Sequence, residues 1–404
     1  MTYLNAASRS PLLATVAEIG VEAVRRKSRP WTIGEDAALI ARIRTLFAEI
    51  IGARDGADAI ALNPSTSYAI SLAAANILRA LQRERRRGGN VLVLDAQMAS
   101  NVMPWQHFVR ALGGGARVVS VARPTTANGG GTTLTDAVLA RLDAGVAVVA
   151  LPAFHWCDGT AVDLVRVGAR ARAVGARLVV DLTQSAGAVP FDVARVRPDF
   201  LAASVHKWLC GPYGFSLLYA APHWRADGMP LDHHERRRRG ADDPAWDEAG
   251  AFVPGAGYPT DFVDGQASRL DAGGRPNIVT APMLRAGLEQ VAAWGPARVA
   301  AALRPLTERV ARGARALGFA VPSPAERAPH IVGLRVPEGA GPSMPDVRAV
   351  GKFLKARGVS VSVRAGAIRV SPFLYNTADD VDRLVALLGD CCREHRATRG
   401  RSRL

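Results

Sequence analysis

The sequence predicts an α/β fold in which a mostly parallel sheet is covered by helices on both faces and is followed by a smaller α+β unit. Apolar runs with strand character occur at 91–94, 117–121, 147–151, 177–181 and 215–219. Segments with helical periodicity lie between them, for example 70–82, 134–142 and 164–174. Strands that are apolar along their length and alternate with helices are typical of parallel sheets buried on both faces. Ligands of such sheets bind beyond the carboxyl ends of the strands.

The chain has 404 residues, enough for a large domain and a smaller one. Residues 222–270 are rich in Gly, Pro, Asp and Arg and predict an extended excursion, which a helix at 281–294 follows. From about residue 300 the pattern becomes helix 300–316, strands 320–322 and 330–335, helix 345–357, strands 359–363 and 367–370, and helix 378–394. We therefore expect an N-terminal segment (1–25) that packs on the small domain, a large domain (26–295), a small α+β domain (296–395) and a basic disordered tail (396–404).

The formal charge of +15 is carried almost wholly by arginine. These arginines are dispersed and are not interleaved with aromatic side chains, so we expect no nucleic-acid partner. No run approaches about 18 uninterrupted apolar residues, so no membrane-spanning helix or membrane partner is expected. The first residues lack a basic segment followed by an apolar one, and a cytoplasmic protein is the default expectation. The four cysteines, at 157, 210, 391 and 392, form no C-x-x-C pair and predict neither a metal site nor a disulfide framework.

One lysine and one aspartate stand where such a sheet would place chemistry. Lys207 lies in the run 202–214, Ala-Ala-Ser-Val-His-Lys-Trp-Leu-Cys-Gly-Pro-Tyr-Gly, and Asp181 ends the apolar run 177–181. An acid at the end of one strand and a lysine after the next can bracket pyridoxal phosphate. The amine forms an imine with the aldehyde, and the carboxylate keeps the pyridine nitrogen protonated, so the ring becomes an electron sink.

Further motifs surround this pair along the chain. They run from Tyr3-Leu-Asn-Ala-Ala through Asp-x-x-Gln at 181–184 and Ser-x-His-Lys at 204–207 to Arg-Val-Ser at 369–371 and Tyr-Asn-Thr at 375–377. In order and spacing they resemble fold-type I pyridoxal phosphate enzymes. More narrowly, they resemble the class V aminotransferase superfamily, which includes cysteine desulfurases, selenocysteine lyases, isopenicillin N epimerase and kynureninase. The resemblance covers nearly the whole chain.

The resemblance implies roles for the residues around the cofactor. Lys207 would be the Schiff-base lysine and the proton shuttle at the substrate α-carbon, and Asp181 would pair with the pyridine nitrogen. Gln184 would donate to the ring hydroxyl oxygen. Ser204 and His206 would bind the phosphate, which suits a hydroxyl and an imidazole donor.

Four more residues carry implied roles. In the segment 64–70, Pro-Ser-Thr-Ser-Tyr-Ala-Ile, Thr66 and Ser67 would offer hydroxyls and backbone N–H groups to the phosphate at a helix N-terminus; both also suit plain helix capping. Arg369 would clamp the substrate α-carboxylate through paired hydrogen bonds. Trp156, in Phe-His-Trp-Cys-Asp-Gly-Thr, would form a wall of the pocket. Whether Arg364 reaches the same mouth is left open.

Departures from the family pattern reduce the number of reactions that we expect of this chain. Met98 occupies the position where desulfurases stack a histidine on the cofactor ring, and a thioether cannot act as an acid or base. The stretch 359–368 is short and lacks the mobile cysteine of desulfurases, so persulfide formation on the protein is not expected. The loop 271–277, Asp-Ala-Gly-Gly-Arg-Pro-Asn, resembles a loop that relatives donate across a dimer to the phosphate, with Gly274 in place of a threonine and Arg275 inserted. A homodimer with shared active sites is therefore expected.

The resemblance implies an enzyme that acts on an amino acid or amino-acid conjugate. β-Elimination, of the kind that cleaves C–S bonds, is the first expectation. Aminotransfer is the second, and epimerisation or decarboxylative deamination follow, because sequence does not fix which bond stands perpendicular to the ring. A non-catalytic basic binding protein is the alternative of another class, and the joint presence of Lys207, Asp181 and Gln184 argues against it.

Overall fold

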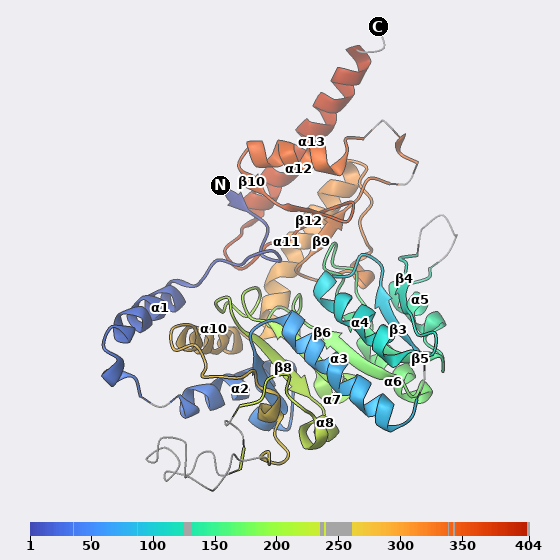
Figure 1. Ribbon diagram of the computed structural model, residues 1–404. Helices are drawn as coiled ribbons and strands as arrows, with labels where there is room; N and C mark the ends of the chain where they lie inside the picture. The colour runs from blue at the N-terminus through green and yellow to red at the C-terminus, as the bar shows by residue number, and fades with distance from the viewer. Residues whose placement is uncertain are drawn as a thin grey trace.

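A computed structural model describes residues 1–34, 36–86, 88–124, 131–234, 238–239, 261–337, 339–341 and 344–401. Figure 1 shows a large lower part built around one sheet and a smaller upper part from which the last helix projects. The excursion expected at 222–270 falls partly outside these residues, because 235–237 and 240–260 are not described. No helix in the described part of the chain is long and apolar enough to cross a membrane.

The large part contains a seven-stranded sheet in the order β2-β8-β7-β6-β5-β3-β4. Its strands are β2 (Ile60–Asn63), β3 (Asn90–Leu94), β4 (Val118–Val121), β5 (Val146–Pro152), β6 (Arg177–Asp181), β7 (Phe200–Ser204) and β8 (Ser216–Ala220). β8 pairs antiparallel with both of its neighbours, and the other pairs are parallel. The predicted α/β fold with a mostly parallel sheet is confirmed.

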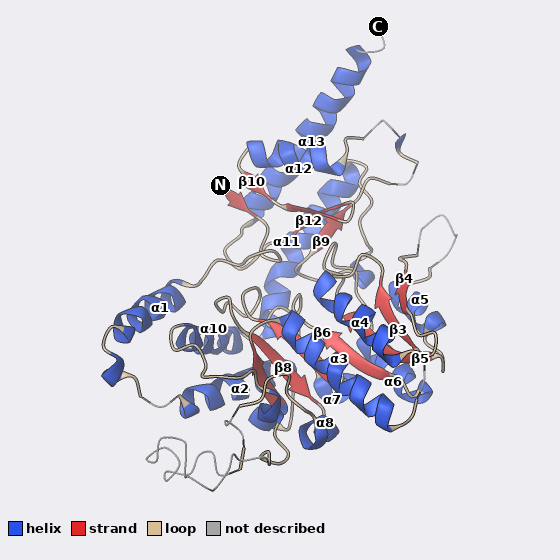
Figure 2. Cartoon of the chain, viewed as in Figure 1, coloured by secondary structure: helices blue, strands red, loops and turns tan. Residues whose placement is uncertain are grey.

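Helices cover both faces of this sheet (Figures 1 and 2). The first group packs together as α3 (Thr66–Arg83) and α4 (Met103–Leu112), and α3 contacts β6, β7 and β8. The second group packs in succession as α5 (Leu134–Arg141), α6 (Leu164–Val174) and α7 (Val193–Val196). Right-handed crossovers place the two groups on opposite faces. The described residues of this part also form α2 (Ala37–Ile51), α8 (Pro222–Asp227) and α10 (Thr280–Trp294).

The sheet brings the lysine and the aspartate to one edge. β6 and β7 are parallel neighbours, with Asp181 opposite Ala202 in the register. Asp181 is the last residue of β6, and Lys207 follows the end of β7 by three residues. Because the carboxyl ends of parallel strands lie at the same edge of a sheet, both side chains project into one region.

The upper part has its own apolar core. A three-stranded antiparallel sheet in the order β11-β12-β9 is formed by β9 (Val332–Leu334), β11 (Ser362–Arg364) and β12 (Ala367–Val370). Its helices are α11 (Pro296–Ala316), α12 (Val347–Ala356) and α13 (Ala378–Arg401). Their apolar side chains form a second buried cluster, separate from the one under the large sheet.

The N-terminal segment divides between the two parts. β1 (Thr2–Tyr3) pairs in parallel with β10 (Val359–Ser360), and Leu4 is buried in the upper cluster. α1 (Ala14–Lys27) instead packs on α10, where Gly20 lies against Met283 of the large part. The first residues therefore lie against the upper part and α1 lies against the large part, which differs from the expectation for residues 1–25. The absence of a side chain at Gly20 permits this close approach.

Two other details differ from the sequence-based expectations. The strand expected at 320–322 is a single bridge between Ala320 and Arg335. The tail expected to be disordered continues α13 as far as Arg401, while residues 402–404 lie outside the described residues. Residues 396–399, Arg-Ala-Thr-Arg, include three strong helix formers, so this stretch extends a helix that is already nucleated.

Candidate active site

Lys207 and Asp181 share a buried region at the carboxyl edge of the sheet. Burial lowers the pKa of Lys207 to about 8, although Asp181 acts in the opposite direction; the charges of Arg369 and Arg364 lower it further. Burial raises the pKa of Asp181, and hydrogen bonds from Thr183 together with the Lys207 charge oppose that rise. Oδ1 of Asp181 accepts from the Thr183 N–H at 2.9 Å. Within the described residues Thr183 is the source of hydrogen bonds to this carboxylate, which keeps capacity to accept from a ligand.

A group of hydroxyls lies at the N-terminus of α3. Oγ1 of Thr66 lies 2.6 Å from Oγ of Ser204 and 3.3 Å from the hydroxyl oxygens of both Thr183 and Ser216. Ser65 caps the helix by accepting from the Tyr68 N–H at 3.1 Å. Hydroxyl donors beside free backbone N–H groups at a helix N-terminus form a site for a dianionic phosphate. The sequence identified Thr66 and Ser204 but missed Thr183 and Ser216, whose contacts depend on strand pairing.

Ser67 is in the first turn of α3 with an exposed side chain and no hydrogen bond from it in the described structure. It can therefore serve the phosphate through its backbone N–H. His206 is half-buried and stacks on Tyr213, with ring centroids 4.2 Å apart and an interplanar angle of 18°. Burial lowers the pKa of His206 to about 4, with Lys207 and Arg9 adding to the effect. Its imidazole is thus neutral near pH 7 and can still donate one hydrogen bond.

The Gln184 side chain has two partners that the sequence did not predict. Its Oε1 accepts from the Trp208 indole N–H at 3.0 Å, and its Nε2 donates to the Ala7 carbonyl at 3.0 Å. The amide therefore ties the N-terminal segment to the lysine loop. Only its second amide hydrogen remains for a cofactor oxygen.

Arg369 comes from β12 of the upper sheet and is buried against the large part. Its Nη1 donates to the Trp156 carbonyl at 2.9 Å, and its Nη2 donates to Oγ of Ser362 at 3.3 Å. Nε of Arg369 is buried without a hydrogen-bond partner among the described residues. Burial lowers the pKa of Arg369 to about 10. A buried guanidinium N–H without an acceptor costs free energy unless a ligand accepts its hydrogen bond. A carboxylate ligand suits this donor.

Met98 and Trp156 are the residues that the sequence motifs assign to the pocket around the ring. Met98 precedes the short turn at 99–101 and is 44% exposed, so its thioether is available to pack on a flat ring. The Trp156 indole N–H donates to the Ala96 carbonyl at 2.8 Å, which fixes the plane of the ring. His155 is buried and its Nε2 lies 2.9 Å from the Asp95 carbonyl; burial lowers its pKa to about 4.

The turn that follows Trp156 is held by a buried charge cluster. Asp158 is fully buried and accepts from Arg123, from Nη2 of Arg335 at 3.0 Å and from the Thr160 hydroxyl at 2.8 Å. The Gly333 N–H of β9 donates to the Asp158 carbonyl at 3.0 Å. This cluster joins the two parts of the molecule next to the site and was not identified from the sequence.

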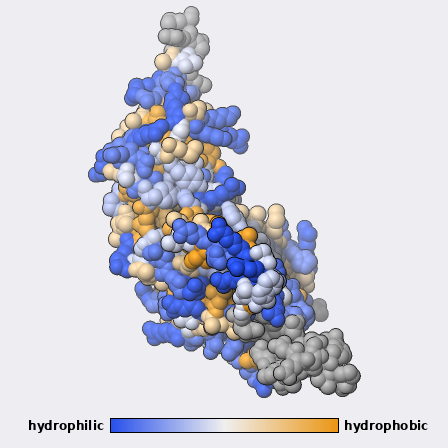
Figure 3. Space-filling model, turned by 90° about the vertical axis from the view of Figure 1, so that its left-hand side faces the viewer, coloured by the Kyte–Doolittle hydropathy of each residue, from blue (hydrophilic) through white to orange (hydrophobic). Residues whose placement is uncertain are grey.

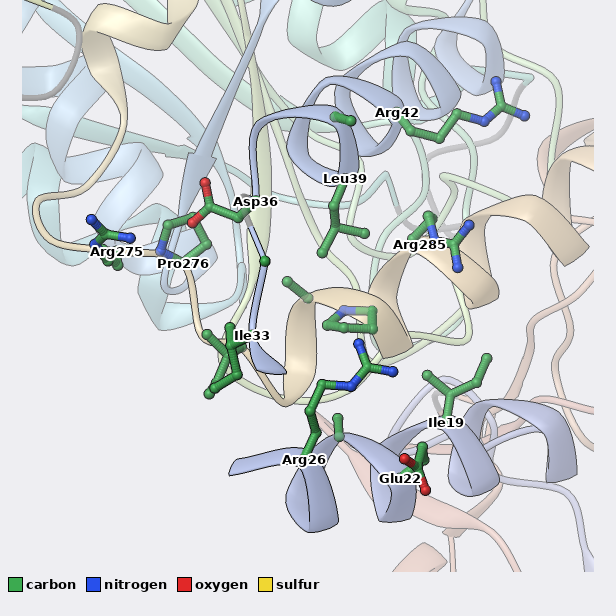
Figure 4. Close-up of a pocket in the computed structure, with 16 residues that line it drawn as sticks. Ile19, Glu22, Arg26, Ile33, Asp36, Leu39, Arg42, Arg275, Pro276 and Arg285 are labelled. Atoms are coloured by element: carbon green, nitrogen blue, oxygen red, sulfur yellow. The ribbon is translucent and has the colours of Figure 1, made fainter. Parts of the chain in front are cut away.

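Two cavities border the loop 271–277. A smaller cavity of about 200 Å³ is lined by this loop and by Asn63, Pro64 and Gly214. Pro64 immediately precedes the N-cap of α3. A larger cavity of about 610 Å³ lies between α1, α2 and α10 (Figure 4). In Figure 4, Arg26 reaches across it, with Arg42 and Arg285 on one side and Arg275 on the other. Lys207 does not line it.

Comparison with known proteins places the chain in a family. The family model of Aminotransferase class-V matches residues 31–384. A probable cysteine desulfurase of Methanothermobacter thermautotrophicus is 29% identical over 235 residues, 57% of this chain and 55% of that protein. A cysteine desulfurase of an Enterobacter species is 28% identical over 196 residues, so these two alignments span about half of each relative. A probable cysteine desulfurase of Pyrococcus abyssi is 24% identical over 88% of this chain and 84% of its own length.

Solved structures have the same fold over nearly the whole length. An apo cysteine desulfurase from Thermococcus onnurineus has a TM-score of 0.77 and 22% identity, covering 97% of this chain and 94% of that one. A cystine C–S lyase in complex with cysteine persulfide also has a TM-score of 0.77, with 19% identity, covering 96% of this chain and 97% of that one. The likeness confirms the fold-type I architecture. With the match over residues 31–384, the chain belongs to the aminotransferase class V family.

Proposed function

We propose that the chain is a pyridoxal phosphate-dependent lyase that cleaves the side chain of an amino acid or amino-acid conjugate. The observation that carries the proposal is Lys207, an amine with a lowered pKa in one buried region with the carboxylate of Asp181. A buried carboxylate is costly without a cationic partner, and Asp181 can still accept hydrogen bonds. A protonated pyridine nitrogen would be such a partner. When bound there, the cofactor supplies an electron sink for negative charge at the substrate α-carbon.

The surrounding residues divide the remaining work. Thr66, Ser204 and His206 bind the phosphate at the N-terminus of α3, with the Ser67 N–H beside them. Asp181 fixes the protonation of the pyridine ring, and Gln184 offers one amide hydrogen. Arg369 binds the substrate carboxylate, so that the α-proton lies near the Lys207 amine, which removes that proton and can pass it to the departing side-chain group.

The lyase reading draws on two observations. The sequence relatives are named cysteine desulfurases, and one structural neighbour is named a cystine C–S lyase. A variant of that lyase has been solved with glycine covalently linked to its PLP cofactor. The cysteines of this chain are all buried, and burial raises the pKa of Cys157 to about 11 and of Cys210 to about 12. Thiols of this kind are poor nucleophiles. We therefore propose that the cleaved sulfur group leaves as a free product and forms no persulfide on the protein.

A screen of the purified protein tests this function. Addition of pyridoxal phosphate should produce a visible absorption band that the Lys207→Ala variant lacks. Cysteine conjugates should then yield pyruvate and ammonia without an acceptor. Product that forms only with a 2-oxo acid would assign aminotransfer instead, and inversion alone would assign epimerisation. A protein that never gains the band would sink the enzyme proposal.

We also propose a homodimer in which the loop 271–277 serves the partner's phosphate site. The loop is anchored at its base, where Asp271 accepts from Nη2 of Arg44 at 2.5 Å and from the Leu62 N–H at 2.8 Å. The face that carries α1 exposes Val24 and Trp31 at 58% and 80%, and Figure 3 shows apolar patches among hydrophilic side chains there. Light scattering of wild type and of Trp31→Glu tests this proposal; a monomeric wild type overturns it.

A further inference from the structure

Two arginines lie on the same face of the upper sheet and point toward the site. In the β11–β12 hairpin, Ser362 pairs with Arg369 and Arg364 pairs with Ala367. Paired residues share a face of a sheet, and so do residues two apart along a strand. The guanidinium carbons of Arg364 and Arg369 each lie 5.9 Å from the centroid of the Trp156 ring. The two cations therefore flank one tryptophan.

The hairpin that carries them is as short as a hairpin can be. Its turn consists of Ala365 and Gly366, both with positive φ, of 41° and 73°. Such a two-residue turn matches the twist of the flanking strands. The hairpin therefore has no long loop that could fold over Arg364. Beside the turn lies a cavity of about 630 Å³ whose lining includes Ala96, His155 and Ala365.

The two arginines differ in what they already contact. Arg369 is buried and uses two of its nitrogens on Trp156 and Ser362. Arg364 is half-buried, and its one hydrogen bond in the described structure goes from Nη1 to the Val363 carbonyl at 3.1 Å. Among the described residues no carboxylate forms an ion pair with Arg364. The positive charge of Arg364 thus lies beside the site without a negative partner. A ligand anion would supply that partner.

The neighbouring cations do not share this property. Arg335 donates to Asp158 at 3.0 Å and to the Ala365 carbonyl at 2.7 Å, and Arg123 pairs with the same aspartate. The carboxylate of Asp95 also lines this cavity and raises the pKa of Arg123 against its burial. Two acids therefore offset these two arginines, whereas Arg369 and Arg364 have no carboxylate partner among the described residues. Arg369 is assigned to the substrate α-carboxylate, so the charge left for a second anion is that of Arg364.

We infer that Arg364 selects substrates that carry a second anionic group on the side chain. This inference rests on the proposed function, because it assigns the α-carboxylate to Arg369 and the distal acid to Arg364. The substrate class is an amino acid or cysteine conjugate that ends in a carboxylate or a group of similar charge. The two-residue turn adds no further loop over Arg364, whose side chain stays half-buried and reachable by such an extension.

A pair of ligands that differ only in charge tests the inference. S-carboxymethyl-L-cysteine and S-carbamoylmethyl-L-cysteine have the same shape, one ending in a carboxylate and the other in an amide. Dissociation constants come from the change in cofactor absorbance on titration of the holoenzyme, with L-glutamate and L-glutamine as a second pair. The acid should bind about 10–100-fold more tightly than the amide, as one charge-assisted contact permits.

Variants separate selection from general damage. Arg364→Gln should abolish the acid preference while the cofactor band remains, and Arg364→Lys should restore part of it. Arg357→Gln is the matched control, because Arg357 lies in the same part of the molecule, pairs with Glu394 at 3.1 Å and stacks on Phe353. It should keep the wild-type preference.

The outcomes that count against the inference are distinguishable. Absence of the cofactor band would defeat the proposed function itself. A wild-type protein with the band that binds acid and amide equally, or that binds neither acid, would overturn the inference about Arg364 and leave the proposed function standing. An Arg364→Gln variant that keeps the full acid preference would overturn it as well.

Discussion

Lys207 should capture aldehydes at a lower pH than an ordinary lysine. Its pKa is lowered from 10.5 to about 8, chiefly because burial disfavours the charged amine. Only the neutral amine attacks an aldehyde. The rate at which the apo-protein captures pyridoxal phosphate should therefore rise about tenfold per pH unit below pH 8 and level off above it.

The difference between the two pKa values sets the magnitude. At pH 7 an amine of pKa 8 is about 10% neutral, whereas one of pKa 10.5 is about 0.03% neutral. Lys207 should therefore react about 300-fold faster at pH 7 than an unperturbed lysine of the same accessibility. The chain contains only three other lysines, Lys27, Lys352 and Lys355, and all are exposed. They serve as internal comparisons in one sample.

Borohydride trapping followed by peptide mass spectrometry measures the rate at each lysine separately. Two variants test the cause. Asp181→Asn removes the charge that raises the pKa of Lys207, so the midpoint of the profile should move to lower pH. Arg369→Gln removes a charge that lowers it, so the midpoint should move to higher pH. A wild-type profile that still rises above pH 10, or shifts of the opposite sign, would refute the assignment.

Three further changes probe how the site is held. Thr66→Val removes the hydroxyl at the centre of the α3 cluster and should weaken pyridoxal phosphate binding about tenfold in a fluorescence titration. Asp158→Asn leaves two arginines without their buried carboxylate and should lower the free energy of unfolding by about 3 kcal/mol in urea. Gly333→Ala would place its Cβ 2.1 Å from Cβ of Asp158, so it should lower Tm and weaken substrate binding together.

Each of these changes has a matched control. Ser67→Ala removes an exposed hydroxyl from the same helical turn but keeps the backbone N–H, so cofactor affinity should change little. Asp382→Asn breaks an exposed ion pair with Arg309 and should cost far less stability than Asp158→Asn. Gly34→Ala adds a Cβ that meets nothing within 4 Å and should leave Tm unchanged. Controls as damaging as the test variants would contradict the assigned contacts.

The strands that carry the site were predictable where they are long and β-branched. Val146–Pro152 and Arg177–Asp181 are rich in valine and buried, so their pattern indicated parallel strands and fixed the position of Asp181. β2 and β7 carry little such signal, because Ile60–Asn63 has four residues and Phe200–Ser204 contains two alanines. The motif before Lys207, rather than strand character, placed the lysine at the sheet edge.

Side-chain partners were less predictable because they depend on distant segments. Gln184 was expected to face the cofactor ring, but its amide joins Ala7 and Trp208, and Ala7 lies 177 residues away in sequence. Tyr213, stacked on His206, stood in the motif around Lys207 without an assigned role. Motif spacing predicts which residues gather at a site, but it does not predict which of their donors and acceptors remain free for a ligand.

The position of Arg369 is set before any substrate arrives. The turn 155–160 contacts the upper sheet on one side and the cofactor region on the other. The Trp156 carbonyl accepts from Arg369, and the Asp158 carbonyl accepts from the Gly333 N–H of β9. Gly159 lies so close to Ile331 that a Cβ would approach the Ile331 carbonyl oxygen to 2.4 Å. A junction packed this closely resists relative movement. The two parts therefore hold Arg369 and Lys207 at a fixed separation, and under the proposed function this leaves selection among substrates to Arg364.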